Sequence, residues 1–446
     1  MPVAPAALDV QAAARSPEAP VAPNLLQSPG VPGHSFRSLR RAARAADPFA
    51  LRVTQLRGGN PRGEYVLYHA RAARRATNNP ALEFAKTFGL PVVMAEWLDE
   101  PHLSPRIEAF IRAGAERTAR LAAVEYRFEP DREVLDRARF VVTDEFPTLP
   151  VPESATHLFD GNGLLPMRAI EKEQYSAKFF RDKAHRLFEQ FVVLPEVGEP
   201  HPQLERFVRD GLDGYATMRN KSPRHVSGLS PFLHFGEIGI GEIAAAVFAS
   251  DADDEDIDAF LEEAVIRREL SFNMCFYNPR YDSLEALPAW ARATLDKHRG
   301  DRRKPVYSYE EFERAATHDA VWNLSQRQLV ACGTIHGYLR MLWGKKIIEW
   351  SETPEEAHRI MVRLHDEYAL DGRDPNTHAG ILWCFGKHDR PWAPERPIFG
   401  SIRWMSSEQT AKKVRLKEIE EIVAECERGQ ASSSSDFLRG QRKLFF

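Results

Sequence analysis

Three tryptophans lie in the second half of the chain, and the spacing of two of them favours one face of a helix. Trp343 and Trp350 are seven residues apart, and Trp322 precedes Trp343 by 21 residues. Side chains seven positions apart in a helix point in nearly the same direction. Such indole rings either pack a hydrophobic core or, beside a redox cofactor, relay electrons. The residues alone leave both interpretations open.

The segment HVSGLSPFLHFGEI combines small residues with a helix start. Ser230 followed by Pro231 is typical of a capped first turn, with Ser230 as the capping residue. Ser227 and Gly228 come directly before this pair. Backbone N–H groups and small hydroxyls at a helix N-terminus can bind an anion, so the segment is either an anion site or an ordinary capped helix.

A tight polar loop is expected in the segment DGRDPNTHAGILWCFG. Asp371, Arg373 and Asp374 precede an apolar stretch that contains Trp383. An Arg–Asp pair in such a loop can hold a polar cofactor ring, and the same residues also suit a surface turn. The loop alone does not distinguish the two.

Charged residues crowd one expected helix in the segment FLEEAVIRRELSF. A solvated charged face is one interpretation, but the flanking apolar residues indicate that part of the cluster points inward. Its members are Glu262, Glu263, Arg267, Arg268 and Glu269.

Several classes of site are excluded by missing motifs. The chain has no G-x-G-x-x-G opening a helix, no Walker-type loop, no H-E-x-x-H and no nucleophile elbow. Its four cysteines form no C-x-x-C pair, so we expect buried or inert thiols in a reducing cytosol, with neither a disulfide framework nor a metal site. The net charge of -4 says little about nucleic acid, which needs only a local basic face.

Strands and helices alternate in the first part of the chain after an Ala- and Pro-rich leader. Strands are expected at 64–70, 90–97 and 138–146, and helices at 79–89 and 106–123. Three or four strands alternating with helices predict a small parallel α/β sheet. From about residue 176 onward the patterns are helical. No run of about 18 apolar residues is present, so no membrane span is expected.

The 446 residues, 43% of them hydrophobic, are enough for two packed domains. We expect a disordered leader and basic segment at 1–60 and a reduced, Rossmann-like α/β domain at 61–165. An all-α domain follows at 166–428, and a flexible tail at 429–446.

Seven segments taken in order resemble the class II cyclobutane pyrimidine dimer photolyases of the photolyase/cryptochrome family. The resemblance spans about 173 to 403. The segments are EQYSAKFFRDKA, GYATMRN, SGLSPFLHFGEI, RRELSFNMCFYNPRYDSLEALPAWARATL, VWNLSQRQLVACGTIHGYLRMLWGKKIIEW, LDGRDPN and RPIFGSIRWM.

The resemblance implies an α/β antenna domain and a helical domain that binds FAD in a folded shape. Asp371 and Asp374 would face the flavin rings, and the helix carrying Arg268 would line the cofactor. The phosphate and ribitol side would be contacted by Tyr215, Ser227, Gly228, Leu229, Ser230 and Pro231.

The resemblance also implies the reaction, which is light-driven repair of pyrimidine dimers in DNA by electron transfer from excited reduced FAD. Glu263 would contact the flipped-out lesion, and Met341 and Trp383 would pack on it. Arg219 would fill the space that the dimer leaves in the duplex. The residues that would photoreduce FAD are Trp322, Trp343 and Trp350.

Two features depart from the family pattern. His365 stands where the family usually has Asn, at a position that faces flavin N5, and histidine can change protonation near neutral pH. The α/β domain is shortened after its first hundred residues, so no antenna chromophore is assigned. These departures motivate a second hypothesis, a non-repairing, cryptochrome-like flavoprotein photosensor.

The tail ends in GQRKLFF, which resembles the peptide by which bacterial repair proteins bind the sliding clamp. Gln441, Leu444 and Phe445 would be the anchors, and the rival hypothesis is that this peptide packs back on its own domain. We expect a monomeric enzyme of the cytoplasm, associated with the nucleoid.

Overall fold

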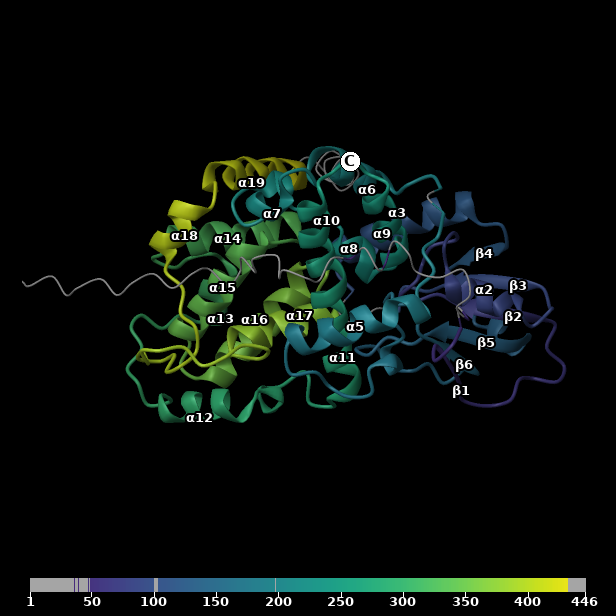
Figure 1. The fold of residues 1–446 in the computed structure, drawn as a ribbon, viewed down its shortest axis with the longest axis horizontal. Coiled ribbons are helices and arrows are strands. Elements are labelled where there is room, and N and C mark those ends of the chain that lie inside the picture. The colour runs from purple at the N-terminus through teal and green to yellow at the C-terminus, as the bar shows by residue number, and fades with distance from the viewer. Residues whose placement is uncertain are drawn as a thin grey trace, which may run out of the picture.

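The computed structural model describes residues 49–99, 103–196 and 198–431, together with Phe36, Leu39 and Asp47. A β-sheet forms one end of the molecule, and helices build the rest (Figure 1). No helix within these ranges is long and apolar enough to cross a membrane.

Six strands form one sheet in the order β1-β6-β5-β2-β3-β4. All neighbours pair in parallel except β1, which runs antiparallel to β6. The expectation of three or four strands was therefore too low, and β1 lies inside the segment 1–60 that was assigned to the leader and the basic segment. The strands are β1 Val53–Gln55, β2 Tyr65–His69, β3 Val92–Glu96, β4 Glu125–Phe128, β5 Ala138–Asp144 and β6 His157–Phe159.

The central strand β2 has the burial expected for the middle of a parallel sheet. All five of its residues are buried, because helices cover both faces of a parallel sheet and leave no face to solvent. The helices of this part are α2 Pro80–Lys86, α3 Pro105–Leu121 and α4 Glu133–Asp136. The short α4 is the only helix between β4 and β5.

Helices follow one another after β6, and the described residues beyond Phe159 contain no further strand. They are η1 Met167–Ala169, α5 Ala177–Phe191, α6 Pro202–Asp210, α7 Tyr215–Met218, η2 Pro223–His225, α8 Ser230–His234, α9 Ile240–Phe248, α10 Asp254–Leu261, η3 Glu262–Arg267, α11 Arg268–Tyr277, η4 Leu284–Ala286, α12 Ala289–Lys297, α13 Tyr309–Glu313, α14 Ala320–Cys332, α15 Gly337–Trp350, α16 Pro354–Tyr368, α17 Pro375–Cys384, α18 Ser407–Lys413 and α19 Leu416–Ala431.

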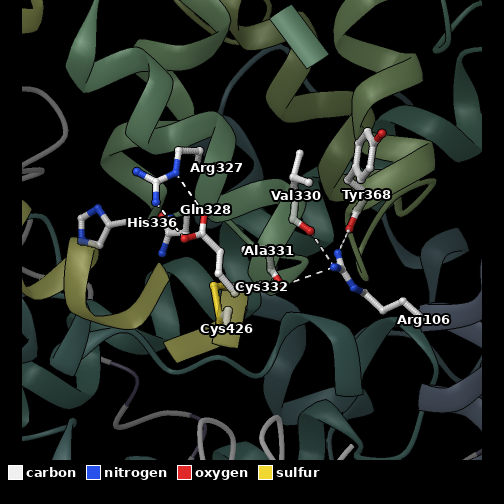
Figure 2. Close-up of a disulfide and its surroundings, with 10 residues drawn as sticks. Arg106, Arg327, Gln328, Val330, Ala331, Cys332, His336, Tyr368 and Cys426 are labelled. Carbon is white, nitrogen blue, oxygen red and sulfur yellow. Dashed lines mark hydrogen bonds and ion pairs between the residues drawn. A yellow bond between two sulfur atoms is a disulfide. The ribbon is translucent and has the colours of Figure 1, made fainter. Parts of the chain in front are cut away.

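A single arginine of the α/β part contacts two helices of the helical part. The guanidinium of Arg106, on α3, donates to Val330 O at 2.6 Å and Ala331 O at 3.3 Å, near the end of α14. It also donates to Tyr368 O, at 3.0 Å, at the end of α16 (Figure 2). Backbone carbonyls at a helix C-terminus lack partners within the helix, so Arg106 caps both ends at once.

A disulfide joins Cys332, at the end of α14, to Cys426 on α19 (Figure 2). Their Cα atoms are 5.5 Å apart, within the usual range for a disulfide. The prediction that all four cysteines are unpaired was wrong for these two. Cys275 and Cys384 are free and buried, as expected.

Candidate functional site

The three tryptophans form a continuous series of rings inside the helical domain. Trp343 and Trp322 stack with centroids 6.5 Å apart and an interplanar angle of 5°. Trp350 lies 6.1 Å from Trp322, nearly edge-on. All three are buried, on α14 and α15, so they also belong to the core. Trp343 and Trp350 lie on one helix, as their spacing predicted, whereas Trp322 reaches them from the neighbouring helix α14.

His365 lies at the inner end of this series. Its ring is 5.0 Å from that of Trp343 and nearly perpendicular to it. Nδ1 is 2.9 Å from the carbonyl oxygen of Met361, to which it donates its proton. Burial, reinforced by the Arg340 guanidinium, lowers the pKa of His365 to about 4. The imidazole is therefore neutral at physiological pH, with Nε2 as an acceptor.

A buried ion pair lies beside His365. Arg340, on α15, reaches Asp371 with 3.3 Å between nitrogen and oxygen, and Ser230 hydrogen-bonds the same carboxylate. Burial would raise the pKa of Asp371, but the guanidinium and the hydroxyl outweigh it and hold the pKa below its usual value. Sequence reasoning missed Arg340, and Arg373 of the same loop instead donates to Asp366 O.

The segment Ser227–Pro231 forms the turn into α8. Gly228 has φ +64°, a left-handed conformation that glycine adopts without strain. The prediction that Ser230 caps the helix was wrong by one residue. Leu229 occupies the N-cap and Ser230 the first helical position, which leaves its hydroxyl free to bond Asp371.

Asp374 has a structural role that the sequence did not reveal. It is the N-cap of α17, where its carboxylate accepts from the N–H of Asn376 at 2.8 Å. Its other oxygen lies 3.1 Å from Nδ1 of His234, on α8. The residue therefore joins α8 to α17 beside Asp371. Arg268 is also buried, and donates to Asn162 O at 2.7 Å.

Glu263 and Arg219 are brought together as an ion pair, with 3.6 Å between Oε1 and a guanidinium nitrogen. The Arg219 guanidinium also lies 5.5 Å over the ring of Tyr215. Glu263 is 42% exposed and lies in η3, a π-helical turn; such turns are rare and frequent at functional sites. Its neighbour Glu262 points inward instead, to Arg181 and Arg267.

Trp383 is half-buried on α17, with the Arg267 guanidinium 5.0 Å over its ring. Because η3 carries both Arg267 and Glu263, it brings Trp383 near the Glu263–Arg219 pair. Met341 is partly buried against the helical core, one residue after Arg340.

A basic cluster surrounds Lys413, at the end of α18. Burial, together with Arg403, Lys221 and Arg219, lowers the pKa of Lys413 to about 8. Its Nζ lies 4.0 Å from the ring of Tyr338, and no hydrogen-bond acceptor for it is found among the described residues. A buried ammonium with cations as neighbours and no acceptor is suited to bind an anion.

These residues fit a polar, anionic cofactor with ring N–H groups. Ser227 and Ser230 offer hydroxyls, Arg340 offers donors, and Asp371 offers a buried acceptor. A Cβ added to Gly380 would meet no atom within 4 Å, so α17 borders open space one turn before Trp383. No cluster of three potential metal ligands occurs in the described part of the chain. Gln441, Leu444 and Phe445 lie outside it.

No family model matches the sequence. A deoxyribodipyrimidine photo-lyase of Methanothermobacter thermautotrophicus is 35% identical over 440 residues, with 83% of this chain and 97% of that protein covered. The chain belongs to the deoxyribodipyrimidine photo-lyase family. A family member of Oryza sativa is 37% identical over 329 residues, covering 63% of this chain and 64% of its own.

Solved structures confirm the photolyase/cryptochrome fold. A cryptochrome of Synechocystis superposes with a TM-score of 0.63 at 11% identity, over 84% of this chain and 93% of its own. A class III photolyase of Agrobacterium tumefaciens superposes with a TM-score of 0.59 at 15% identity, over 87% of this chain and 92% of its own. A Sulfolobus tokodaii photolyase, described with two FAD molecules, superposes with a TM-score of 0.55 at 14% identity, over 78% of this chain and 87% of its own. The predicted architecture is confirmed.

Proposed function

We propose that this enzyme splits cyclobutane pyrimidine dimers in DNA with light. The observation that carries the proposal is the family membership, together with the arrangement it explains: a series of tryptophans that ends at a polar, buried site. Bound FAD, reduced and excited by light, supplies the single electron that opens the cyclobutane ring.

The chain's own residues would hold FAD on the helices that border this site. The phosphate and ribitol side of FAD would be contacted by Tyr215 and by the segment from Ser227 to Pro231. The helices around the site are held in place by Arg268 and Asp374. Asp371 would accept a hydrogen bond from a ring N–H of the flavin, and Arg340 holds that carboxylate ionised. His365 presents an acceptor nitrogen, where an asparagine amide can either donate or accept.

The lesion would be reached by base flipping, as photolyases are among the enzymes that extrude their target from the base stack. Glu263 is exposed enough to meet the extruded bases, and Met341 and Trp383 offer apolar surface. Arg219, paired with Glu263 in the free protein, exchanges that partner for the gap in the duplex. Lys413 and its basic neighbours suit the phosphates on either side.

The test is repair of a defined dimer in an oligonucleotide, in light and in darkness, with flavin absorption recorded on the same sample. Light-dependent restoration of the two thymines supports the proposal. A flavin spectrum without repair would favour the photosensor hypothesis, which His365 motivates. Absence of flavin after reconstitution would contradict both hypotheses.

Class II membership is part of the proposal and rests on the seven segments of the sequence. The DNA substrate tests class II membership. A class II enzyme is expected to repair cyclobutane dimers in duplex DNA, and an enzyme that acts only on single strands would contradict this membership. The antenna chromophore stays unassigned. A cavity of about 400 Å³ is lined by Arg75 and Asn79, from the loop between β2 and α2, and by Glu83 of α2, among others.

We also propose that the C-terminal peptide docks on the sliding clamp, which would hold the enzyme near DNA at the nucleoid. Gln441, Leu444 and Phe445 would make the contact, and α19 is fixed to the body by the disulfide before the tail begins. Deletion of 441–446 should abolish clamp binding in calorimetry and leave the melting temperature and oligonucleotide repair unchanged. A lower melting temperature without clamp binding by the full chain would favour self-packing instead.

A further inference from the structure

Gln326 contacts Trp343, the tryptophan of the series that lies against His365. The glutamine is on α14, one helical turn after Trp322, so the two side chains project from the same face of that helix. Trp322 stacks on the ring of Trp343, and Oε1 of Gln326 accepts the indole N–H of Trp343 at 2.8 Å. One face of α14 therefore supplies both the neighbouring ring and the hydrogen-bond partner of Trp343.

The side-chain amide of Gln326 is fixed in one orientation by its two partners. Its nitrogen donates to the carbonyl oxygen of Glu313, at 3.3 Å, and a carbonyl oxygen can only accept. The indole N–H can only donate, so it must face the amide oxygen. Exchanging the amide oxygen and nitrogen would lose both hydrogen bonds. Gln326 is 0% exposed, so the amide is held away from solvent.

The nature of this acceptor matters once Trp343 is oxidised. An indole ring that has lost one electron is a strong acid, because its positive charge weakens the N–H bond. An amide oxygen accepts a hydrogen bond but is too weakly basic to take the proton. His365 contacts the same ring but offers no second route, because the single N–H of the indole is directed to Gln326. The oxidised ring therefore keeps its proton.

Trp322 has an acceptor of the same kind. Its indole N–H donates to the backbone carbonyl oxygen of Trp343 at 3.0 Å, which is also an amide oxygen. Both inner rings can therefore return to neutral indole by gaining an electron alone, without a proton having to come back. The acceptor for Trp322 belongs to the backbone, whereas the acceptor for Trp343 is a side chain that substitution can change.

We propose that Gln326 is a positioning residue of the electron route, an inference that rests on the proposed role of the tryptophans. Its amide oxygen keeps the proton on Nε1 of Trp343 while that ring is oxidised. Trp343 gives one electron to the photoexcited flavin and becomes a radical cation. One electron from Trp322 then makes Trp343 neutral, and Trp322 becomes the radical cation. The N–H bond of Trp343 stays intact throughout, so the positive charge moves on toward Trp350 instead of being trapped on the innermost ring.

The first test follows radicals in the flavin-loaded, unaltered protein after a laser flash, by transient absorption. The early signal should be that of a tryptophan radical cation, and the transfer from Trp322 to Trp343 should proceed equally fast in light and heavy water. A neutral tryptophanyl radical that forms on Trp343 before the charge moves on, or a clear isotope effect on this transfer, would overturn the proposal without any variant.

Gln326→Glu places a base where the amide oxygen was. The ionised carboxylate should take the proton of oxidised Trp343 and leave a neutral radical, which an electron from Trp322 alone cannot restore to indole. When protonated, the same carboxyl offers a carbonyl oxygen and should behave as the amide does. Loss of the outer radical signals should therefore follow the ionisation of the introduced carboxyl as pH rises, with its infrared carbonyl band as the measure. The unaltered protein should show no such pH dependence.

Gln328→Glu is the matched control. Gln328 is buried on the same helix, but its Oε1 accepts the backbone N–H of His336 at 3.0 Å and not an indole N–H. This variant should transfer charge as the unaltered protein does at every pH. In the dark, NMR should show a shifted indole N–H resonance of Trp343 in Gln326→Leu and an unshifted one in the control, which tests the hydrogen bond without photochemistry.

Trp343→Phe separates the two levels of the inference. If this variant reduces its flavin in light at the unaltered rate, the tryptophan route itself is refuted. If it does not, and Gln326→Glu with an ionised carboxyl still passes the charge to Trp350 as the unaltered protein does, only the role of Gln326 is refuted.

Discussion

Arg340 and Asp371 offer a quantitative test of the candidate site. Their charges are 3.3 Å apart, and the side chains are 23% and 6% exposed. At an effective dielectric constant of about 20, the attraction is about 5 kcal/mol before desolvation. Arg340→Met leaves a buried carboxylate without its partner, a change that costs about 3–5 kcal/mol. We expect that loss in the free energy of unfolding of the flavin-free protein at neutral pH.

The loss should depend on pH with a definite sign. In the unaltered protein the pKa of Asp371 lies below its usual value, so its contribution is complete above the unfolded pKa of about 3.9 and is lost as pH falls through the folded pKa. In Arg340→Met, burial dominates and raises the folded pKa above the unfolded one. The penalty then shrinks as pH falls toward about 4, where the buried carboxyl is protonated.

Urea denaturation at neutral and acidic pH measures both effects. Arg340→Met combined with Asp371→Asn should recover much of the stability, because no charge is then buried alone. Arg359→Met is the matched control on α16: its pair with Glu356 is exposed, so the cost should stay below about 1 kcal/mol. A cost for Arg340→Met no greater than this control, or a double variant no more stable than the single one, would refute the reasoning.

Four further predictions concern function and stability. Trp343→Phe should keep FAD but lose most of its photoreduction in steady illumination, while the chemically reduced variant still repairs. Glu263→Ala should weaken lesion binding by about 1–3 kcal/mol in titrations, whereas Glu262→Ala should lower the melting temperature because its carboxylate is ion-paired inside. Cys426→Ser opens a loop with a sequence separation of 94, worth about 4–5 kcal/mol of chain entropy, so its melting temperature should fall to that of the thiol-reduced protein. Arg219→Ala should reduce the preference for damaged over undamaged duplex, and equal losses on both would make it a plain phosphate contact.

The long, regular elements were predictable because their periodicity is local. The strand at 64–70 and the helix with Trp343 and Trp350 are found where their patterns place them. The missed strands β1 and β6 have three residues each, too few for a pattern, and β4 is a charged edge strand. These segments become strands because β1 pairs with β6, β6 with β5 and β4 with β3. Such pairing is a tertiary interaction that local sequence does not encode.

Side-chain partners were the least predictable part of the site. Arg340 lies 31 residues before Asp371, and no local pattern connects them; the nearer Arg373 was the natural but wrong partner. The Cys332–Cys426 disulfide was equally unpredictable from local sequence, because the two cysteines meet only when α19 packs on α14. The residue assignments themselves came from the family resemblance, and those of Glu263, Met341 and Trp383 stay predictions until they are tested.

Through Arg106, the α/β part has a structural role that does not depend on any ligand. Its guanidinium satisfies carbonyls at the ends of α14 and α16, the helices that carry Trp322 and His365. A helical domain produced alone would present these carbonyls to solvent and lose a contact that joins α14 to α16. Attempts to shorten the enzyme to its helical half should therefore keep α3, which carries Arg106.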